Sequence, residues 1–242
     1  MQYHIYCLSY NNQERKNNMK NRFENLGLEY TFYGGVNYQD PRIHADSYKQ
    51  CWSCMYGHLD MIKMFYSDKN VEFGIFCEDD ILIHKNFKDI IPDVINDFKI
   101  LNLDLLLLGY LATFKIQPYY NEFHLKENQS ENNLLLENYR YHNFPDDVWG
   151  AQMYMLSKNS AKKILDKYGD DSGYAERSQN NPDMTPFSAD WTITKDGNRA
   201  LLSPPLIIED GKSDLSHYGG HYGQYLFHKK SHELYYDPNY FI

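Results

Sequence analysis

The sequence is poor in cysteine and in positive charge, and both shortages exclude classes of protein. Four cysteines in 242 residues are too few for a disulfide scaffold, so reduced thiols are expected. The 24 Lys and Arg residues are outnumbered by 33 Asp and Glu residues, which gives a formal net charge of −9. Binding to nucleic-acid phosphates requires clustered basic residues. We therefore expect no nucleic-acid partner.

Long apolar segments are also absent. The first ten residues, MQYHIYCLSY, lack the basic and apolar regions of a secretion signal. The most apolar stretch, LDLLLLGYLATF, is shorter than the roughly 20 residues needed to span a bilayer, and it contains an acid. The sequence thus predicts a protein without a membrane span, located in the cytoplasm.

The order of patterns along the chain predicts an α/β fold in one domain, residues 1–242. Strand-like segments alternate with segments whose apolar residues recur at helical spacing, which is typical of a largely parallel, Rossmann-like central sheet flanked by helices. Pro92 should bend one of these helices or delay its start. The expected strands are YHIYCLSY, LEYTFYGG, VEFGIFC, LDLLLLG and AQMYMLS, and the expected helices lie near residues 11–27, 47–66, 86–101 and 157–169.

Two parts of the chain show no regular pattern. Residues from about 115 to 147 are rich in Asn, Glu and Tyr and are typical of a long surface insertion. The tail from about residue 211 is rich in His, Tyr and Gly, and this composition predicts irregular structure folded over the domain.

Three consecutive acids, Glu78, Asp79 and Asp80, follow the apolar segment VEFGIFC. In an open α/β sheet, ligands bind beyond the carboxyl ends of the strands, where these acids are expected. Crowded carboxylates repel one another and resist burial, and a divalent cation relieves both effects. On an extended backbone Glu78 and Asp80 would project to one side and suit Mn²⁺ or Mg²⁺, while Asp79 would point away. A solvated acidic turn or a helix cap is the alternative.

The acidic string resembles the nucleotide-sugar motif, an Asp-x-Asp equivalent, of glycosyltransferase family 25. This family includes bacterial lipopolysaccharide transferases and collagen galactosyltransferases. In CLSYNNQERKNNM, Leu8, Arg15 and Met19 fit the family's spacing of Leu, Arg and Met from the first strand into the first helix. The segment GGVN, residues 34–37, is similar to the turn that follows.

Further segments resemble the family in the same order. QCWSCMYGHLDMI is similar to a family helix with a Cys and a Ser-His pair, matched at Cys54 and His58, although Gly57 replaces the serine. WGAQMYMLSKNSAKKIL resembles a Gly-x-x-Ala-Tyr-x-x-Ser segment, PFSADWTI a Pro-Val-Asp block, and PPLIIEDGKSD a Pro-Leu stretch that ends in Ser-Asp. The resemblance covers most of the chain and fails mainly over residues 115–147.

The resemblance implies a GT-A-type nucleotide-diphosphate-sugar transferase fold, a divalent cation and inversion at the anomeric carbon. The implied donor is a uridine-diphosphate (UDP) hexose, with galactose or glucose favoured, and the implied acceptor is a hydroxyl of a glycan or protein. Acceptor contacts would come from the insertion and the tail.

Asp80 and Glu78 are the expected metal ligands, and Asp79 would lie near the ribose or the sugar. His217, in the tail segment LSHYGGHYG, would add a nitrogen ligand, with His221 as a weaker candidate. A tail histidine can equally be exposed without any such role.

Inversion requires a base on the face of the sugar opposite the leaving group. Asp190, in the Pro-Val-Asp-like block, is the expected base, and Trp191 beside it could exclude water. A helix-capping role for Asp190 fits the sequence equally well. Asp214 is the second candidate, as a base or as the partner of a sugar hydroxyl. Trp149 could stack on an acceptor sugar or fill the core.

Leu8 and Arg15 are expected beside the nucleotide, with Arg15 reaching the pyrophosphate unless it is one of several solvated helix charges. Cys51, Cys54 and His58 share a helical face, and this spacing permits a zinc or redox site. No second Cys pair accompanies them. The preferred interpretation is a packed helix face with His58 near the nucleotide.

The sequence therefore favours a metal-dependent, inverting glycosyltransferase. A carbohydrate-binding or scaffold protein that keeps the fold without turnover is the main alternative, because Gly57 departs from the family pattern and the surface is acidic and rich in Tyr. A metal-dependent phosphoesterase that uses the acids for two cations is a third possibility.

Overall fold

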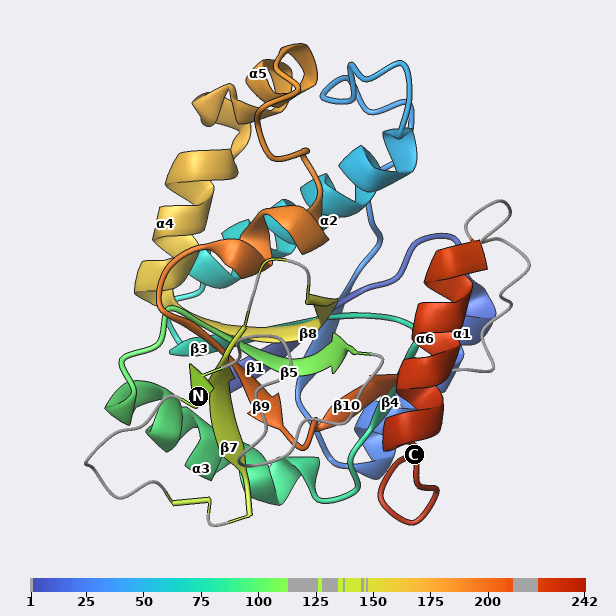
Figure 1. The fold of residues 1–242 in the computed structure, drawn as a ribbon, viewed down its shortest axis with the longest axis vertical. Helices are drawn as coiled ribbons and strands as arrows, with labels where there is room; N and C mark the ends of the chain where they lie inside the picture. Colours follow the sequence, from blue (N-terminus) through green and yellow to red (C-terminus); the bar gives the residue numbers. More distant parts are fainter. Residues whose placement is uncertain are drawn as a thin grey trace.

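The protein is built around an eight-stranded sheet with helices on both faces (Figure 1). The computed structural model describes residues 2–112, 126–127, 135–136, 138–144, 146, 148–210 and 222–242. The strands are β1 (Tyr3–Leu8), β2 (Tyr30–Tyr33), β3 (Phe73–Glu78), β4 (Ile81–Ile83), β5 (Leu105–Leu111), β6 (Lys126–Glu127), β7 (Arg140–Asn143), β8 (Trp149–Ser157), β9 (Arg199–Ser203) and β10 (Ile207–Glu209).

The helices alternate with these strands over most of the chain. The α-helices are α1 (Gln13–Asn25), α2 (Lys49–Ser67), α3 (Phe87–Ile100), α4 (Lys158–Tyr168), α5 (Tyr174–Asn180) and α6 (Tyr222–Tyr235), and the short 3₁₀ helices are η1 (Asp170–Ser172), η2 (Ala189–Trp191) and η3 (Ile193–Lys195). The five strands and four helices expected from the sequence are all present in the structure. The α/β fold class is confirmed.

The large sheet has the order β2-β1-β3-β8-β5-β9-β7-β6. Strand β1 pairs in parallel with β2 and β3, and β5 pairs in parallel with β9. Strand β8 runs antiparallel between β3 and β5, and β7 is antiparallel to both β9 and β6. Six of the eight strands therefore point one way, and β7 and β8 run against them. Strand β10 pairs with β4 in a separate two-stranded sheet.

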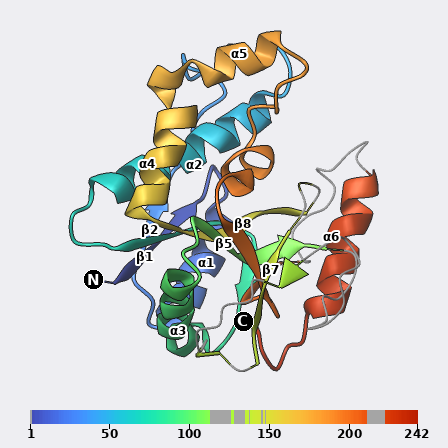
Figure 2. The same ribbon diagram turned by 60° about the vertical axis from the view of Figure 1, so that its left-hand side comes forward.

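Two hydrophobic clusters cover the two faces of the large sheet. Helices α2 and α4 lie over one face, and α1 and α3 lie over the other (Figures 1 and 2). The period of two along β3 sends Phe76 into the cluster beneath α2, whereas Ile75 and Cys77 enter the cluster against α1 and α3. The alternation explains why this strand reads as a continuous apolar run, since both of its faces are covered.

Two segments predicted to be irregular contain regular elements among their described residues. The insertion predicted at about 115–147 contains β6 and β7, because Tyr141 of β7 pairs with Leu202 of β9 and is buried. The tail predicted to be irregular contains α6, which lies beside β10 (Figure 1). Tertiary contacts stabilise both elements in spite of weak local patterns. Pro92 lies inside α3, so it does not delay the helix start at Phe87.

No helix among the described residues is both long enough and apolar enough to cross a bilayer.

Asp97 connects α3 to β7 through a buried pair. Its side chain is fully buried, and it accepts a hydrogen bond of 2.7 Å from the Tyr141 hydroxyl and one of 2.9 Å from the Leu135 N–H. Burial of the ring, together with this carboxylate, raises the pKa of Tyr141 well above its ordinary value. The pair thus holds the strand that follows the insertion against the core.

Replacement of Asp97 by Ala should lower the free energy of unfolding by about 2–3 kcal/mol, because it leaves a buried hydroxyl and a backbone N–H without an acceptor. Tyr141→Phe should cost less, since only a hydroxyl is lost. Urea denaturation of both variants and of the double variant measures the coupling. The double variant should lose about 1 kcal/mol less than the sum of the two single losses, and strict additivity would contradict the contact.

Candidate active site

The candidate site lies where β1 and β3 end side by side. Leu8 of β1 pairs with Glu78 of β3, and the following residues Ser9 and Asp79 are joined by a hydrogen bond of 2.7 Å from the Ser9 hydroxyl to Oδ2 of Asp79. Both are buried. The carboxyl end of a parallel strand pair is the ordinary location of a ligand site in α/β sheets.

Arg15 brings a positive charge to this strand end. The Asn12 side chain caps α1 by accepting a hydrogen bond of 3.0 Å from the Arg15 N–H, so Arg15 lies in the first turn. Its Nη1 lies 3.1 Å from Oδ2 of Asp80 and 3.6 Å from Oδ1 of Asp79. One guanidinium therefore contacts both carboxylates, and the alternation expected for an extended backbone does not continue beyond the end of β3.

Glu78 faces the helix α2. Its Oε1 lies 3.5 Å from Nε2 of His58 and 3.6 Å from Sγ of Cys54. The His58 side chain is fully buried, and its Nδ1 lies 3.0 Å from the hydroxyl of Tyr154 on β8. Glu78 therefore has a protein partner on its inner side, while about a third of its side chain remains exposed.

Asp190 lies on η2 and is attached to β8. Its Oδ1 accepts a hydrogen bond of 3.0 Å from the N–H of Ala151. Burial raises the pKa of Asp190, and the charge of Glu78 raises it further. The charge of His58 acts to lower it. Asp190 thus belongs to the same electrostatic environment as the acids that follow β3, although it is far from them in sequence.

The pKa values of the carboxyl groups in the site are shifted in opposite directions. Burial raises the pKa of Asp80 well above its usual range, the charges of Glu78 and Glu209 raise it further, and Arg15 opposes them. Burial also acts to raise the pKa of Glu78, but His58, Cys54 and Arg15 outweigh it and hold that pKa below its ordinary value. Glu78 is therefore ionised beside carboxyl groups that retain protons more strongly.

The site has the properties of a cation-binding position. Oδ1 of Asp80 is buried and has no hydrogen-bond partner among the residues that the structure describes. A buried oxygen of this kind is unfavourable unless a ligand satisfies it. Cys54, His58 and Glu78 form a second possible ligand set, because one ligand atom from each lies within 4.8 Å of the others. The two sets share Glu78, and they differ in softness: oxygen pairs suit Mn²⁺ or Mg²⁺, whereas the sulfur and nitrogen atoms suit Zn²⁺.

Gly57 leaves room for Leu8. A Cβ placed on Gly57 would lie 2.9 Å from a terminal methyl carbon of Leu8, closer than side chains pack. The glycine in the Ser-His-like pair therefore lets α2 approach the end of β1 next to Glu78. A side chain at this position would require Leu8 to move.

The residues predicted from the sequence are largely assembled here. Two predicted metal ligands lie in the described part of the chain, and contacts or strand pairing join them to four further predicted residues. Asp190 is related to them through the charge of Glu78, which influences its pKa. These residues are Leu8, Arg15, His58, Glu78, Asp79, Asp80 and Asp190. Asp214, His217 and His221 lie outside the described residues.

Sequence reasoning missed the residues that position this set. Ser9 fixes Asp79, Tyr154 fixes His58, and the Ala151 N–H fixes Asp190. Tyr154 stands in the segment that resembles the family's Ala-Tyr pattern, so a signal was present, whereas Ser9 has none beyond its place after a strand. Cys51 is exposed and is not part of the group formed by Cys54, His58 and Glu78.

Comparisons with known proteins place the chain in a family. The model of the family described as glycosyltransferase family 25 (LPS biosynthesis protein) matches residues 2–170. The chain is also similar to a solved glycosyltransferase involved in the glycosylation of the major capsid of PBCV-1, with 9% identity, a TM-score of 0.44, and 83% of this chain and 82% of that chain covered.

A second similar structure is mannose-1-phosphate geranyltransferase from Thermus thermophilus, with 9% identity, a TM-score of 0.45, and 83% of this chain and 73% of that chain covered. No curated protein gives a significant match. The family match includes the acids after β3 and all of β8, and it ends before Asp190.

Asp190→Asn should stabilise the metal-free protein at neutral and alkaline pH. Burial raises the pKa of Asp190 in the folded state, so the folded protein binds this proton more tightly than the unfolded chain. The free energy of unfolding of wild type therefore falls as pH rises from the pKa of the unfolded chain, about 4, through the higher pKa of the folded state. The loss is about 1.4 kcal/mol for each unit by which folding raises the pKa. Asn stays neutral and still accepts from the Ala151 N–H.

The measurement is urea denaturation in EDTA between about pH 4 and about pH 8. The advantage of Asp190→Asn should grow with pH and vanish at the acidic end. Asp183→Asn, at an exposed carboxylate, is the matched control and should show no such trend. A constant difference across this range would contradict a raised pKa for Asp190.

Proposed function

This chain belongs to glycosyltransferase family 25, and we propose that it transfers a hexose from a UDP-sugar to a hydroxyl of a glycan or protein, with Mn²⁺ or Mg²⁺ bound and with inversion at the anomeric carbon. Galactose and glucose are the favoured sugars. The observation that carries the proposal is the buried Oδ1 of Asp80, which has no partner among the described residues, next to the ionised Glu78. A negatively charged strand end of this kind suits a cation and the diphosphate that accompanies it.

Glu78 and Asp80 would hold the cation, and His217 would complete the ligand set. When bound, the cation would offset the negative charge that develops on the departing diphosphate. The GT-A-type arrangement is supported by the position of these acids at the carboxyl end of a central strand. The exposed third of Glu78 shows that one of the two carboxylates is open to a ligand from solvent.

Arg15, Leu8, Asp79 and His58 would form the nucleotide side of the site. Arg15 is partly exposed while it contacts Asp79 and Asp80, so its guanidinium can reach a phosphate oxygen from its present position. Leu8 offers an apolar surface beside Glu78. His58 is held by Tyr154 and supports Glu78, which makes its role one of positioning.

Asp190 would act as the base that accepts the proton of the acceptor hydroxyl. A raised pKa suits this task, because a base works best when its pKa lies near the working pH. The hydrogen bond from the Ala151 N–H fixes one carboxylate oxygen and leaves the other for the hydroxyl. Asp214 is the alternative base, or a partner of a sugar hydroxyl.

Asp80→Ala should weaken UDP binding in Mn²⁺ at least about tenfold while leaving the weak metal-free binding nearly unchanged. Titration calorimetry with UDP in Mn²⁺ and in EDTA measures both. Cys54→Ala is the matched comparison: it should retain Mn²⁺-dependent binding if the oxygen pair holds the cation. Loss in Cys54→Ala with retention in Asp80→Ala would assign the metal to the Cys54, His58 and Glu78 set instead.

Asp190→Asn should lower kcat for hexose transfer by about 10²- to 10⁴-fold, because the acceptor proton loses its base. The UDP affinity in Mn²⁺ should stay within about twofold, since Asp190 does not hold the donor. Product formation from UDP-galactose and UDP-glucose in Mn²⁺ is the readout, with Asp183→Asn as the control. An unchanged kcat would remove Asp190 from the reaction.

The same assays separate the alternatives. A carbohydrate-binding or scaffold protein would bind glycans and show no Mn²⁺-dependent affinity for UDP. A phosphoesterase would release phosphate without forming a glycoside.

A further inference from the structure

A cleft lies next to the segment that carries Asp190. It has a volume of about 530 Å³ and is lined by the start of α2, by α5 and by the segment that leads into η2. Pockets for small ligands usually have volumes of about 300–1,000 Å³, so the cleft can hold one or two sugar rings. Two lining residues, Ser188 and Trp191, lie on either side of Asp190 in the sequence.

The cleft lies near the proposed base. Cys51 lines the cleft, and the pKa of its thiol is raised by burial and, to a smaller extent, by the charge of Asp190. Together with the position of Ser188 and Trp191 in the lining, this places Asp190 near the cleft.

The lining of the cleft is aromatic and uncharged. Trp52 and Phe187 form a buried floor with ring centroids 5.1 Å apart and an interplanar angle of 64°. Tyr48 and Trp191 are exposed at the rim, with relative exposures of 76% and 37%. Aromatic faces bind the C–H face of a pyranose ring, because both surfaces are apolar and nearly flat.

Polar groups around these rings match the edge of a sugar. Ser47, Ser178, Gln179 and Ser188 contribute hydroxyl and amide groups, which donate to and accept from sugar hydroxyls. None of the described residues that line the cleft is Lys, Arg, Asp or Glu. The lining therefore lacks the cationic groups that a nucleoside diphosphate requires, and the cleft suits an uncharged glycoside.

Tyr48 is held at the rim by an unusual backbone. It precedes α2 with φ 61° and ψ 26°, a left-handed conformation that is uncommon for a bulky residue. Its carbonyl accepts hydrogen bonds from the N–H groups of Cys51 and Trp52, at 2.9 and 3.3 Å, so the first turn of the helix fixes it. Backbone strain of this kind is concentrated at ligand sites.

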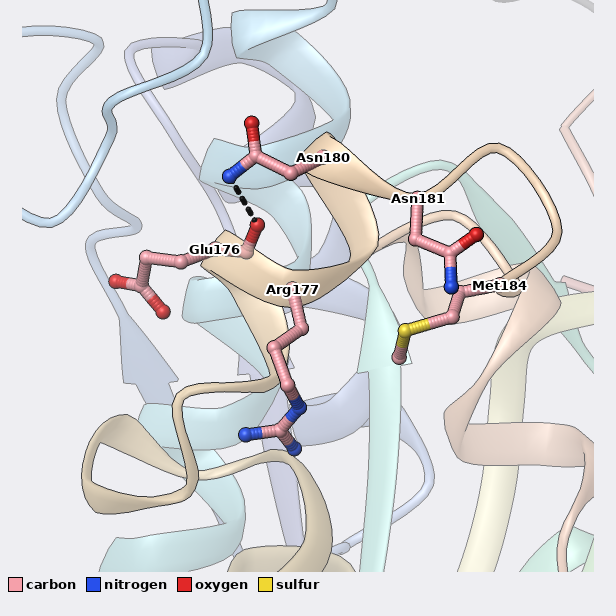
Figure 3. A pocket seen from close by; sticks show the side chains of 5 residues that line it. All are labelled: Glu176, Arg177, Asn180, Asn181 and Met184. Carbon is pink, nitrogen blue, oxygen red and sulfur yellow. Dashed lines mark hydrogen bonds between the residues drawn. The ribbon is translucent and has the colours of Figure 1, made fainter.

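The other hollow on α5 has a different chemistry. Figure 3 shows Glu176, Arg177, Asn180, Asn181 and Met184 around this hollow, in which the Asn180 side-chain amide donates a hydrogen bond of 2.9 Å to the Glu176 backbone carbonyl. Glu176 and Arg177 are exposed, and none of the described residues that line the hollow is aromatic. It therefore lacks the features that select a sugar ring.

We propose that the cleft bounded by Tyr48, Trp52, Phe187 and Trp191 is the acceptor site and binds an uncharged pyranoside, with a ring stacked between Tyr48 and Trp191 and a hydroxyl directed toward Asp190. Only the transfer step in this proposal rests on the proposed function. The binding of a neutral sugar ring at the cleft can be measured without turnover.

The test uses methyl β-galactopyranoside and methyl β-glucopyranoside as probes. Saturation-transfer NMR measures their binding to the full chain, and transfer from UDP-galactose or UDP-glucose in Mn²⁺ gives the KM for the same glycosides. Trp191→Ala removes one rim ring. Tyr48→Gly removes the other from a different element, and Gly adopts the left-handed backbone without strain. Tyr66→Ala, at an exposed ring of α2 outside the cleft, is the control.

Both cleft variants should weaken glycoside binding and raise the glycoside KM by about 3- to 10-fold, the effect of one aromatic contact. The UDP dissociation constant in Mn²⁺ should be the same as in wild type, and Trp191→Phe should restore most of the glycoside affinity. Tyr66→Ala should bind glycoside as wild type does.

Three results would overturn the proposal: no glycoside binding by wild type, glycoside binding unchanged in both cleft variants, or a weakened UDP affinity in these variants with glycoside binding intact. The last result would place the donor in the cleft. If wild type binds glycosides through the cleft but transfers no sugar to them, the cleft stands as a binding site for neutral sugars and the proposed transferase reaction fails.

Discussion

Unbalanced negative charge at the ends of β1 and β3 is the constraint on which the site depends. Three acids follow one another at a strand end that is largely closed to water, and burial raises the pKa of both Asp79 and Asp80. Such groups lower stability unless they are paired. Arg15 supplies positive charge, yet one oxygen of Asp80 still has no partner among the described residues. Stability alone would favour neutral side chains here, and this cost is the physical ground for the proposed ligand.

Each neighbouring element contributes one group that holds this cluster in place. The capped start of α1 presents Arg15, and the close approach of α2 at Gly57 brings His58 to Glu78. The reversed strand β8 serves twice, because Tyr154 positions His58 and the Ala151 N–H positions Asp190. Arg15, His58 and Glu78 therefore lie on regular elements, whereas Asp79 and Asp80 directly follow β3 and are held by Ser9 and Arg15. Rigid elements of this kind favour a preorganised site.

The sequence predicts the elements of this arrangement better than their contacts. The apolar run before Glu78 and the helical spacing around His58 locate both residues on the correct elements, because buried strands and amphipathic helices leave periodic patterns. The reversed direction of β8 leaves no such pattern, so the link between Tyr154 and His58 could not be foreseen. Strand β7 and helix α6 were missed for the related reason that distant residues stabilise them: Asp97 contacts Tyr141, and Glu209 contacts His228.

The acidic strand end and the aromatic cleft offer two different kinds of binding chemistry. At the strand end the partners are carboxylates and a guanidinium, whose interactions with a charged ligand weaken as salt screens them. In the cleft they are aromatic rings and neutral polar groups, whose contacts depend on buried apolar area and are insensitive to moderate salt. In the proposed reaction, a charged donor and a neutral acceptor can therefore each be recognised by interactions that the other cannot use. Asp190 is attached to β8 by one oxygen, burial and the charge of Glu78 raise its pKa, and its neighbours Ser188 and Trp191 line the cleft. In the proposed reaction this single carboxylate would act on a hydroxyl delivered from the cleft.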